Sequence, residues 1–234
     1  MILSDDCWLK QRCYKYNNNE NAECKTANVY CTKLFKLNSL YDEALLSETL
    51  RIRKPLVLDD DNSDYDAFNR LAEIESGIGT YVKEGNNLFI FSNNVGNGKT
   101  SWAIRLLQAY LEKIWVTSDI RCRGLFINVP KFFLSLKDNI SNQNDYIAHI
   151  KEHVLKTDIV VWDEVGTKSL TSFEFENLLS LIDSRINNGL SNIYTSNLYG
   201  SQLQQNIGDR LYSRIVNMSE LVEFRGRDKR GIKL

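Results

Sequence analysis

Apolar and polar residues alternate in blocks from about residue 65 onward. Five short apolar runs have the length and residue types of buried β-strands: Asn87 to Ser92, Gly124 to Val129, Asp158 to Trp162, Ser191 to Ser196 and Leu221 to Arg225. Segments with apolar residues at helical spacing separate them: Lys99 to Glu112, Lys131 to Asn139, Tyr146 to Leu155, Thr171 to Asn187 and Ser201 to Ile215. Strands that alternate with helices predict an α/β fold, with a parallel sheet flanked by helices on both faces.

The first 60 residues have a different pattern. They are polar, with asparagines clustered around residues 16–21, and show no sustained apolar period before Val29. A helical stretch from about Tyr41 to Ile52 leads to an acidic run, Asp59 to Asp64, which is typical of a solvated linker. A further helical pattern, Tyr65 to Lys83, should pack on the strands and helices after it. We expect a small N-terminal module with its linker over residues 1–60 and one larger domain over residues 65–234.

Composition and charge narrow the classes of function. The 234 residues are 43% hydrophobic and 25% charged, as in ordinary globular proteins. The formal net charge of -1 excludes a globally basic nucleic-acid binder, so any contact with DNA must be local. The opening MILSDDCWLK lacks the features of a secretory signal, and no run approaches the ~18 apolar residues of a membrane helix. With an odd number of cysteines, five, these features predict a soluble protein of the reducing cytoplasm without a membrane partner.

A glycine-rich loop with the sequence of a phosphate-binding loop comes directly after the first predicted strand. The glycines let backbone N–H groups point inward, and the start of the next helix adds partial positive charge where phosphate oxygens would lie. Lys99 is expected to bridge the β- and γ-phosphates, and Thr100 to hold Mg²⁺. Asn93 stands where the G-x-x-x-x-G-K-[ST] pattern has its first glycine. The candidate nucleotide-binding residues of the loop are Asn94, Val95, Gly96, Asn97, Gly98, Lys99, Thr100 and Ser101.

Two acids come directly after the apolar run Asp158 to Trp162. Because acids at the end of a buried strand are costly without a cation, Asp163 is expected to ligate Mg²⁺ through water. Glu164 would then orient and deprotonate the water that attacks the γ-phosphate. A second acid at this place favours hydrolysis over the transfer catalysed by a small-molecule kinase. Asn197, after the next strand, could hydrogen-bond that water or the γ-phosphate, although asparagine is a common strand-ending residue.

These motifs together resemble those of the bacterial and phage helicase-loader ATPases of the DnaC/DnaI type, and most closely the phage-encoded branch. The resemblance rests on GNGKT after a strand, VVWDE, YTSN, GDRLYSR and the ending EFRGRDKR, and it covers essentially the whole chain. It implies an AAA+ P-loop ATPase core with a curtailed lid. Its implied function is to deliver a ring-shaped replicative helicase onto single-stranded DNA in replication initiation, with a cycle of Mg-ATP binding and hydrolysis. The resemblance makes Lys99 and Thr100 the Walker A pair, Asp163 and Glu164 the Walker B pair, and Asn197 the sensor-1 residue.

Several arginines also receive roles from the resemblance. Arg214, in GDRLYSR, resembles the arginine finger that reaches the γ-phosphate of a neighbouring subunit, and Arg210, one helical turn earlier, is the alternative. Both could instead be solvated charges on an amphipathic helix. Arg230 resembles the sensor-2 arginine, with Arg225 and Arg227 close enough to leave the register open. An arginine that acts across subunits implies a homo-oligomer in the ATP state.

Four of the five cysteines, Cys7, Cys13, Cys24 and Cys31, lie within the first 31 residues. Four soft ligands are the number that a tetrahedral structural Zn²⁺ site requires, although neither pair has the tight C-x2-C spacing. A polar segment of this size also needs a bound metal ion or a covalent cross-link in order to fold. The segment resembles a variant of the N-terminal zinc module with which DnaI-type loaders contact the helicase. Free thiols in a small helical module and disulfides are the alternatives.

Other patterns point less clearly to chemistry. The sequence from His149 to His153 reads H-x-x-E-H, a zinc-protease pattern that we reject because the helix is polar and no third ligand is apparent. Both histidines are expected on a solvated face. Cys122 is expected to be a small residue near the sheet, while Arg121 and Arg123 beside it could touch DNA phosphates. The final RGRDKRGIK, with five basic residues and one acid, could bind single-stranded DNA by charge or be a solvated tail.

The sequence therefore favours an ATP-dependent helicase loader. An IstB-like transposition-helper ATPase would share the same core but hand DNA to a transposase. The N-terminal cysteines favour the loader, because a helicase-docking module is expected only there. A third hypothesis, an adaptor that holds nucleotide without turnover, is disfavoured by Glu164.

Overall fold

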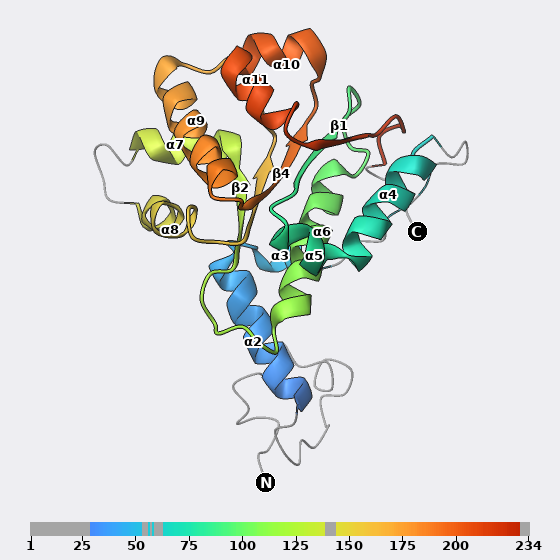
Figure 1. The fold of residues 1–234 in the computed structure, drawn as a ribbon, viewed down its shortest axis with the longest axis vertical. Helices are drawn as coiled ribbons and strands as arrows, with labels where there is room; N and C mark the ends of the chain where they lie inside the picture. Colours follow the sequence, from blue (N-terminus) through green and yellow to red (C-terminus); the bar gives the residue numbers. More distant parts are fainter. Residues whose placement is uncertain (1–28, 53–55, 57, 59–62, 139–143, 230–234) are drawn as a thin grey trace.

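A five-stranded sheet forms the centre of the computed structural model, which describes residues 29–52, 56, 58, 63–138 and 144–229 (Figure 1). The strand order is β2-β3-β4-β1-β5, and every neighbouring pair is parallel. The strands are β1 (Asn87–Phe91), β2 (Gly124–Asn128), β3 (Ile159–Asp163), β4 (Ser191–Ser196) and β5 (Glu220–Glu223). The structure therefore confirms all five predicted strands to within two residues at either end, and with them the parallel α/β fold.

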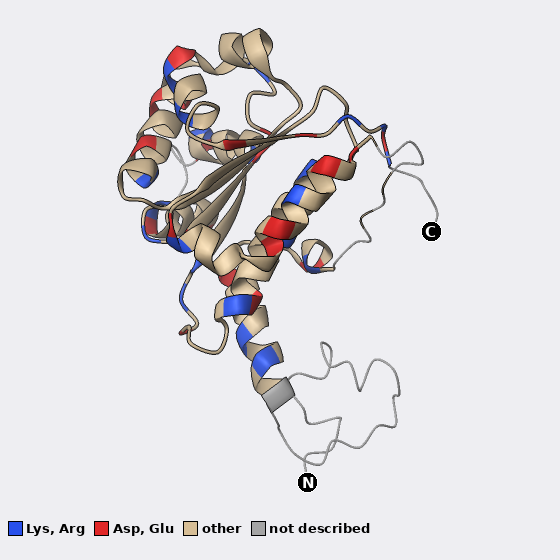
Figure 2. Ribbon diagram, turned by 45° about the vertical axis from the view of Figure 1, so that its right-hand side comes forward, with Lys and Arg blue, Asp and Glu red and all other residues tan. Residues whose placement is uncertain are grey.

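Helices cover both faces of this sheet, because alternate strand residues point to opposite faces. Leu88 and Ile90 of β1 lie in the core beneath the N-terminal helices and α6, whereas Phe89 and Phe91 lie in the core beneath α7 to α11. The helices are α2 (Val29–Glu43), α3 (Glu48–Arg51), α4 (Tyr65–Ser76), α5 (Ile78–Lys83), α6 (Lys99–Ile114), α7 (Val129–Asp138), α8 (Asp145–His153), α9 (Ser172–Asn187), α10 (Gly200–Ile207) and α11 (Asp209–Ile215). Figure 2 shows acidic and basic residues mixed along these outer helices, in keeping with the near-zero net charge.

Three predicted helices have different bounds in the structure. The helix expected over Tyr41 to Ile52 is wrong, because α2 ends at Glu43 and Leu45 adopts a left-handed φ of 60°. This turn lets Ala44 and Leu46 on either side of it both reach the core. The expected helix over residues 65–83 divides at Gly77 into α4 and α5, and the one over residues 201–215 divides at Gly208 into α10 and α11. Gly208 has a φ of 79°, which favours glycine.

The boundary expected between the N-terminal module and the larger domain does not match the packing. Leu37, Leu40 and Tyr41 of α2 share one hydrophobic core with the helices of the larger domain. The N–H of Phe126 in β2 also donates to the carbonyl of Ala44. The apolar face of α2 can be buried only against the sheet and its helices, so at least residues 37–46 belong to the larger domain. Of the four expected zinc ligands, Cys7, Cys13 and Cys24 lie outside the described residues, and Cys31 is half-buried on α2.

The end of the acidic run is not solvated. Asp64 is fully buried, and its carboxylate accepts hydrogen bonds from the backbone N–H groups of Arg225 and Gly226, both at 2.8 Å. It also pairs with Nζ of Lys229 at 2.9 Å. The expectation of a solvated loop is therefore wrong at this position. A buried carboxylate needs such partners, and here the chain after β5 supplies them.

The same C-terminal segment lies against the glycine-rich loop. The N–H of Lys229 donates to the carbonyl of Gly96 at 3.0 Å, and Nδ2 of Asn94 donates to the carbonyls of Arg225 and Gly226. Residues 225–229 are thus held in place rather than forming a free tail. Among the described residues, no helix combines the length and the apolar character that crossing a membrane requires.

We predict that Asp64→Ala lowers the free energy of unfolding by about 2–3 kcal/mol, because it removes three hydrogen bonds to a buried charged acceptor. Urea unfolding measures the change. Asp66→Ala, at an exposed acid in the first turn of the same helix, is the matched control and should change stability by less than about 0.5 kcal/mol. Equal effects of the two substitutions would show that Asp64 does not anchor the C-terminal segment.

Candidate nucleotide-binding site

The glycine-rich loop connects β1 to α6 at the carboxyl edge of the sheet. Gly96 and Gly98 have φ values of 72° and 105°, so both positions use backbone conformations that favour glycine. Asn93 is not one of the described non-glycine residues with positive φ, which are Leu45 and Glu164. The backbone therefore does not require the glycine that the standard pattern has at this place.

The loop is braced by its own polar side chains. Nδ2 of the buried Asn97 donates to Oγ of Ser92 at 2.7 Å. The ammonium group of Lys99 donates to the carbonyl of Asn94 at 2.7 Å and to Oδ1 of Asn97 at 2.9 Å. These two acceptors therefore hold Lys99 at the mouth of the loop. Phosphate oxygens are also hydrogen-bond acceptors, and they could replace the two groups as partners of Lys99.

The carboxylate of Asp163 joins three strands and the first turn of α6. Its Oδ1 accepts hydrogen bonds from the hydroxyls of Thr100 at 2.8 Å and Thr195 at 2.7 Å. Its Oδ2 lies 3.4 Å from Nδ2 of Asn128 at the end of β2. Burial raises the pKa of Asp163, while the two threonine hydroxyls partly offset that shift. A buried carboxylate beside a hydroxyl is a set of hard oxygen ligands that suits Mg²⁺.

Glu164 is held next to Asp163 in a conformation that few non-glycine residues adopt. Its φ is 61°, and its N–H donates to Oγ1 of Thr195 at 3.0 Å. Its carboxylate accepts a hydrogen bond from Nδ2 of Asn128 at 3.1 Å. Left-handed backbone at a non-glycine residue costs free energy and persists only where the surroundings enforce it. Thr195 and Asn128 thus fix both the backbone and the side chain of this acid.

A cavity of about 350 Å³ opens in front of these groups, within the size range of small-molecule pockets. One wall is formed by residues 96–101 of the loop and α6, and another by Glu164 and residues 195–197. Apolar residues from the segment before α4 close the far side, together with α6: Leu50, Ile52, Leu56 and Ile104. Nε2 of Gln108 fixes this wall, because it donates to the carbonyls of Leu50 and Arg51. The cavity therefore has a phosphate-binding end and an apolar end.

Most of the expected nucleotide-site residues meet at this cavity. It is lined by Gly96, Asn97, Gly98, Lys99, Thr100, Ser101, Glu164 and Asn197, and Asp163 lies directly behind Thr100. Asn94 instead binds the C-terminal segment, and Val95 is half exposed. Their part in nucleotide binding stays a prediction, as does that of the lining residues.

The expected arginines do not line the cavity. Nε of Arg214 on α11 pairs with Oδ1 of Asp183 on α9 at 2.5 Å, whereas Arg210 is exposed. Arg225 pairs with Glu223, and Arg230 lies outside the described residues. Roles for these arginines in a neighbouring subunit or as sensor 2 stay predictions.

Sequence reasoning missed Asn128, Thr195 and the apolar wall that includes Leu50, Ile52 and Leu56. Asn128 and Thr195 are polar residues at the ends of predicted strands, which is the signal that could have marked them. Which strands lie beside β3 cannot be read from the order of the chain, because β2 and β4 become its neighbours only in the folded sheet.

Fold and site together define a P-loop ATP-binding protein with an AAA+-type core. The family model described as "IstB-like ATP binding protein" matches residues 62–231, more than half of the chain, and the chain belongs to this family. No curated protein matched the sequence.

Solved structures of replication proteins share this fold at low sequence identity. The crystal structure of the DnaC helicase loader is 21% identical with a TM-score of 0.62, and the match covers 76% of this chain and 100% of that one. For the crystal structure of DnaI the identity is 19%, the TM-score 0.58 and the coverage 78% and 93%. The replication initiator DnaA, bound to AMPPCP and single-stranded DNA, is 18% identical with a TM-score of 0.58, and the match covers 79% of this chain and 52% of that one. At such identities these matches establish the fold.

We predict that Thr195→Val weakens Mg²⁺-dependent nucleotide binding about 10-fold, because it removes the hydroxyl that donates to Asp163 and accepts from the N–H of Glu164. The measurement is the affinity for a fluorescent ATP analogue with and without Mg²⁺. Thr195→Ser keeps the hydroxyl and should bind as the wild type does. If the valine and serine variants bind alike, the hydroxyl does not position the two acids.

Proposed function

We propose that this protein is an ATP-hydrolysing helicase loader, which delivers a replicative DNA helicase onto single-stranded DNA in the bacterial cytoplasm. The observation that carries the ATPase part is the placement of Glu164 beside Asp163, with both acids fixed by Thr195 and facing the loop that bears Lys99. An ATP-binding family whose fold is that of DnaC and DnaI supports the loader part.

The residues of the cavity suit the two ends of ATP. The base would lie against the apolar wall of Leu50, Ile52 and Ile104, and the phosphates would lie along the loop and the first turn of α6. Lys99 would exchange its present acceptors, Asn94 and Asn97, for the oxygens of the β- and γ-phosphates. Such an exchange keeps the ammonium group hydrogen-bonded and adds a full negative charge beside it.

Thr100 and Asp163 would hold Mg²⁺, which when bound neutralises charge on the phosphates. Glu164 would accept a proton from water for attack on the γ-phosphate, and the bond from the γ-phosphorus to the bridging oxygen would break, giving ADP and phosphate. Asn128, which donates to Glu164, would orient this carboxylate, and Asn197, which lines the cavity, would hydrogen-bond the water or the phosphate.

Assembly into a homo-oligomer in the ATP state would complete the site. Arg214 and Arg210 are both on α11, and neither lines the cavity of its own chain, so we propose that the finger acts at the site of a neighbouring subunit. Arg214 is tied to Asp183, which fixes the direction of its side chain, and we propose it as the finger with exposed Arg210 as the alternative. The residues that precede Leu37, with the expected zinc ligands, are proposed to dock the helicase, and the basic C-terminal residues are proposed to contact single-stranded DNA.

We predict that Glu164→Gln lowers kcat for ATP hydrolysis by about 100-fold or more while changing the Kd of ATP less than about threefold, because only proton acceptance is lost. Phosphate release and equilibrium binding give the two constants. Glu176→Gln is the control, since this acid lies on α9 away from the cavity. Absence of hydrolysis in the wild type itself would favour the nucleotide-holding adaptor.

We predict that the tagged full-length protein captures a replicative helicase from a replicating host. The Lys99→Ala variant lacks the ammonium group that would hold the phosphates. It should still capture the helicase, but the amount captured should no longer depend on ATP as it does for the wild type. The readout is the captured helicase with and without ATP. Capture of a transposase in place of a helicase would support the second candidate, an IstB-like transposition helper, which the name of the matching family favours.

A further inference from the structure

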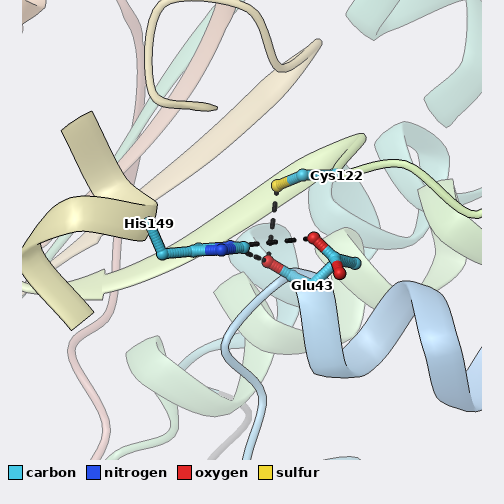
Figure 3. Close-up of side chains that lie close together, drawn as sticks. All are labelled: Glu43, Cys122 and His149. Atoms are coloured by element: carbon cyan, nitrogen blue, oxygen red, sulfur yellow. Dashed lines mark hydrogen bonds and ion pairs between the residues drawn. The ribbon is translucent and has the colours of Figure 1, made fainter. Parts of the chain in front are cut away.

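Three side chains with metal-ligating atoms meet beside the start of β2, at the opposite edge of the sheet from the nucleotide loop. Figure 3 shows Glu43 at the end of α2, Cys122 just before β2 and His149 on α8 pointing toward one another. One ligand atom from each lies within 4.8 Å of the other two. They come from three segments that are distant in the sequence, so the spacing of residues gave no sign of the cluster.

The contacts within this cluster centre on the end of α2. Nε2 of His149 lies 2.8 Å from the carbonyl oxygen of Glu43 and 4.0 Å from its Oε2. The thiol of Cys122 donates to the same carbonyl at 3.3 Å. Cys122 is buried, whereas the side chains of His149 and Glu43 are 24% and 38% exposed, so one side of the cluster is open to solvent. Neither histidine of the H-x-x-E-H pattern is on a fully solvated face as expected, since the side chain of His153 is only 23% exposed.

Hydrogen bonding to the last carbonyls of α2 accounts for only part of this arrangement. A helix end leaves carbonyl groups unpaired, and the imidazole and the thiol could both serve as donors to one of them. That need is met without the carboxylate of Glu43, which nevertheless lies toward the imidazole (Figure 3). A thiol, an imidazole and a carboxylate from three segments thus converge. Together they offer a metal ion a soft sulfur ligand, an intermediate nitrogen ligand and a hard oxygen ligand.

We propose that Glu43, Cys122 and His149 bind a divalent transition-metal ion, with Zn²⁺ as the representative, through a carboxylate oxygen, Sγ and Nε2. Zinc takes these three ligand types at about 2.0–2.3 Å, which puts tetrahedral ligand atoms about 3.4–3.6 Å apart. The ligand atoms now lie within 4.8 Å, so shifts of roughly 1 Å bring them to that spacing. Water can take the fourth position from the exposed side, as in three-ligand zinc sites.

Charge also favours a dication at this place. When the metal binds, the thiol proton leaves to solvent and the imidazole carries its proton on Nδ1, which frees the lone pair of Nε2. A thiolate and a carboxylate then balance the two charges of the ion, and the half-buried site becomes neutral.

A metal ion here would join the end of α2 to the start of β2 and to α8, and so fasten together three segments of the larger domain. This site is separate from the one expected at Cys7, Cys13, Cys24 and Cys31, and it uses the fifth cysteine. Arg123, next to Cys122, pairs with Asp158 at 2.7 Å and is already engaged within the fold.

Zinc titration of the metal-free, full-length chain tests the proposal. A variant in which Cys7, Cys13, Cys24 and Cys31 are all serine should still bind one equivalent of Zn²⁺. Adding Cys122→Ser, His149→Gln or Glu43→Gln to it should weaken binding at least 10-fold. Adding His153→Gln is the matched control and should leave affinity unchanged, since its ring lies beside that of His149 at a tilt of 58° but its Nε2 lies toward Glu152. Co²⁺ should give a thiolate-to-metal absorption band that Cys122→Ser abolishes.

Zinc should also raise the Tm of the four-serine variant by about 5–10 °C at a free concentration a hundred times Kd. Circular dichroism of each metal-free variant verifies that it is folded. If one ligand substitution prevents folding, the other two still test the site. No bound zinc in the four-serine variant, or equal binding after all three ligand substitutions, would overturn the proposal. In that case His149 and Cys122 serve only to cap α2.

Discussion

The hydrogen bonds of one buried carboxylate set the arrangement of the whole nucleotide site. Asp163, at the end of the buried strand β3, accepts from Thr100 at the start of α6 and from Thr195 at the end of β4. Because the acid is buried, it must have these partners, and they in turn fix the loop that precedes α6. The same threonine of β4 accepts from the backbone of Glu164, so the position of the second acid depends on the first.

Both ends of the chain contribute to this arrangement. Leu50, Ile52 and Leu56 contribute to the apolar wall of the cavity, and the carbonyls of Leu50 and Arg51 are tied to α6 through Gln108. Residues 225–229 bind the loop directly and are held by buried Asp64. Both segments thus support the site, because the side chains of Gln108, Asp64 and Asn94 find their hydrogen-bond partners there.

Much of this could be predicted from the sequence, and the errors have physical causes. The strands are apolar runs bounded by polar residues, and the loop requires glycine at Gly96 and Gly98 for local steric reasons, so both were recognised. The helix expected over Tyr41 to Ile52 failed because the turn at Leu45 serves burial of Ala44 and Leu46 against the sheet. Asp64 was expected in solvent because its partners lie more than 160 residues away in the chain.

The sequence by itself determined the class of fold, the phosphate loop and the pair of acids, because each depends on residues close together in the chain. Only the tertiary structure decided which strands flank β3, and therefore that Asn128 and Thr195 hold the two acids. It also brought Glu43, Cys122 and His149 together from three separate segments. The reason is that packing of the sheet and its helices, rather than any local preference, sets the distance between residues that are far apart in sequence.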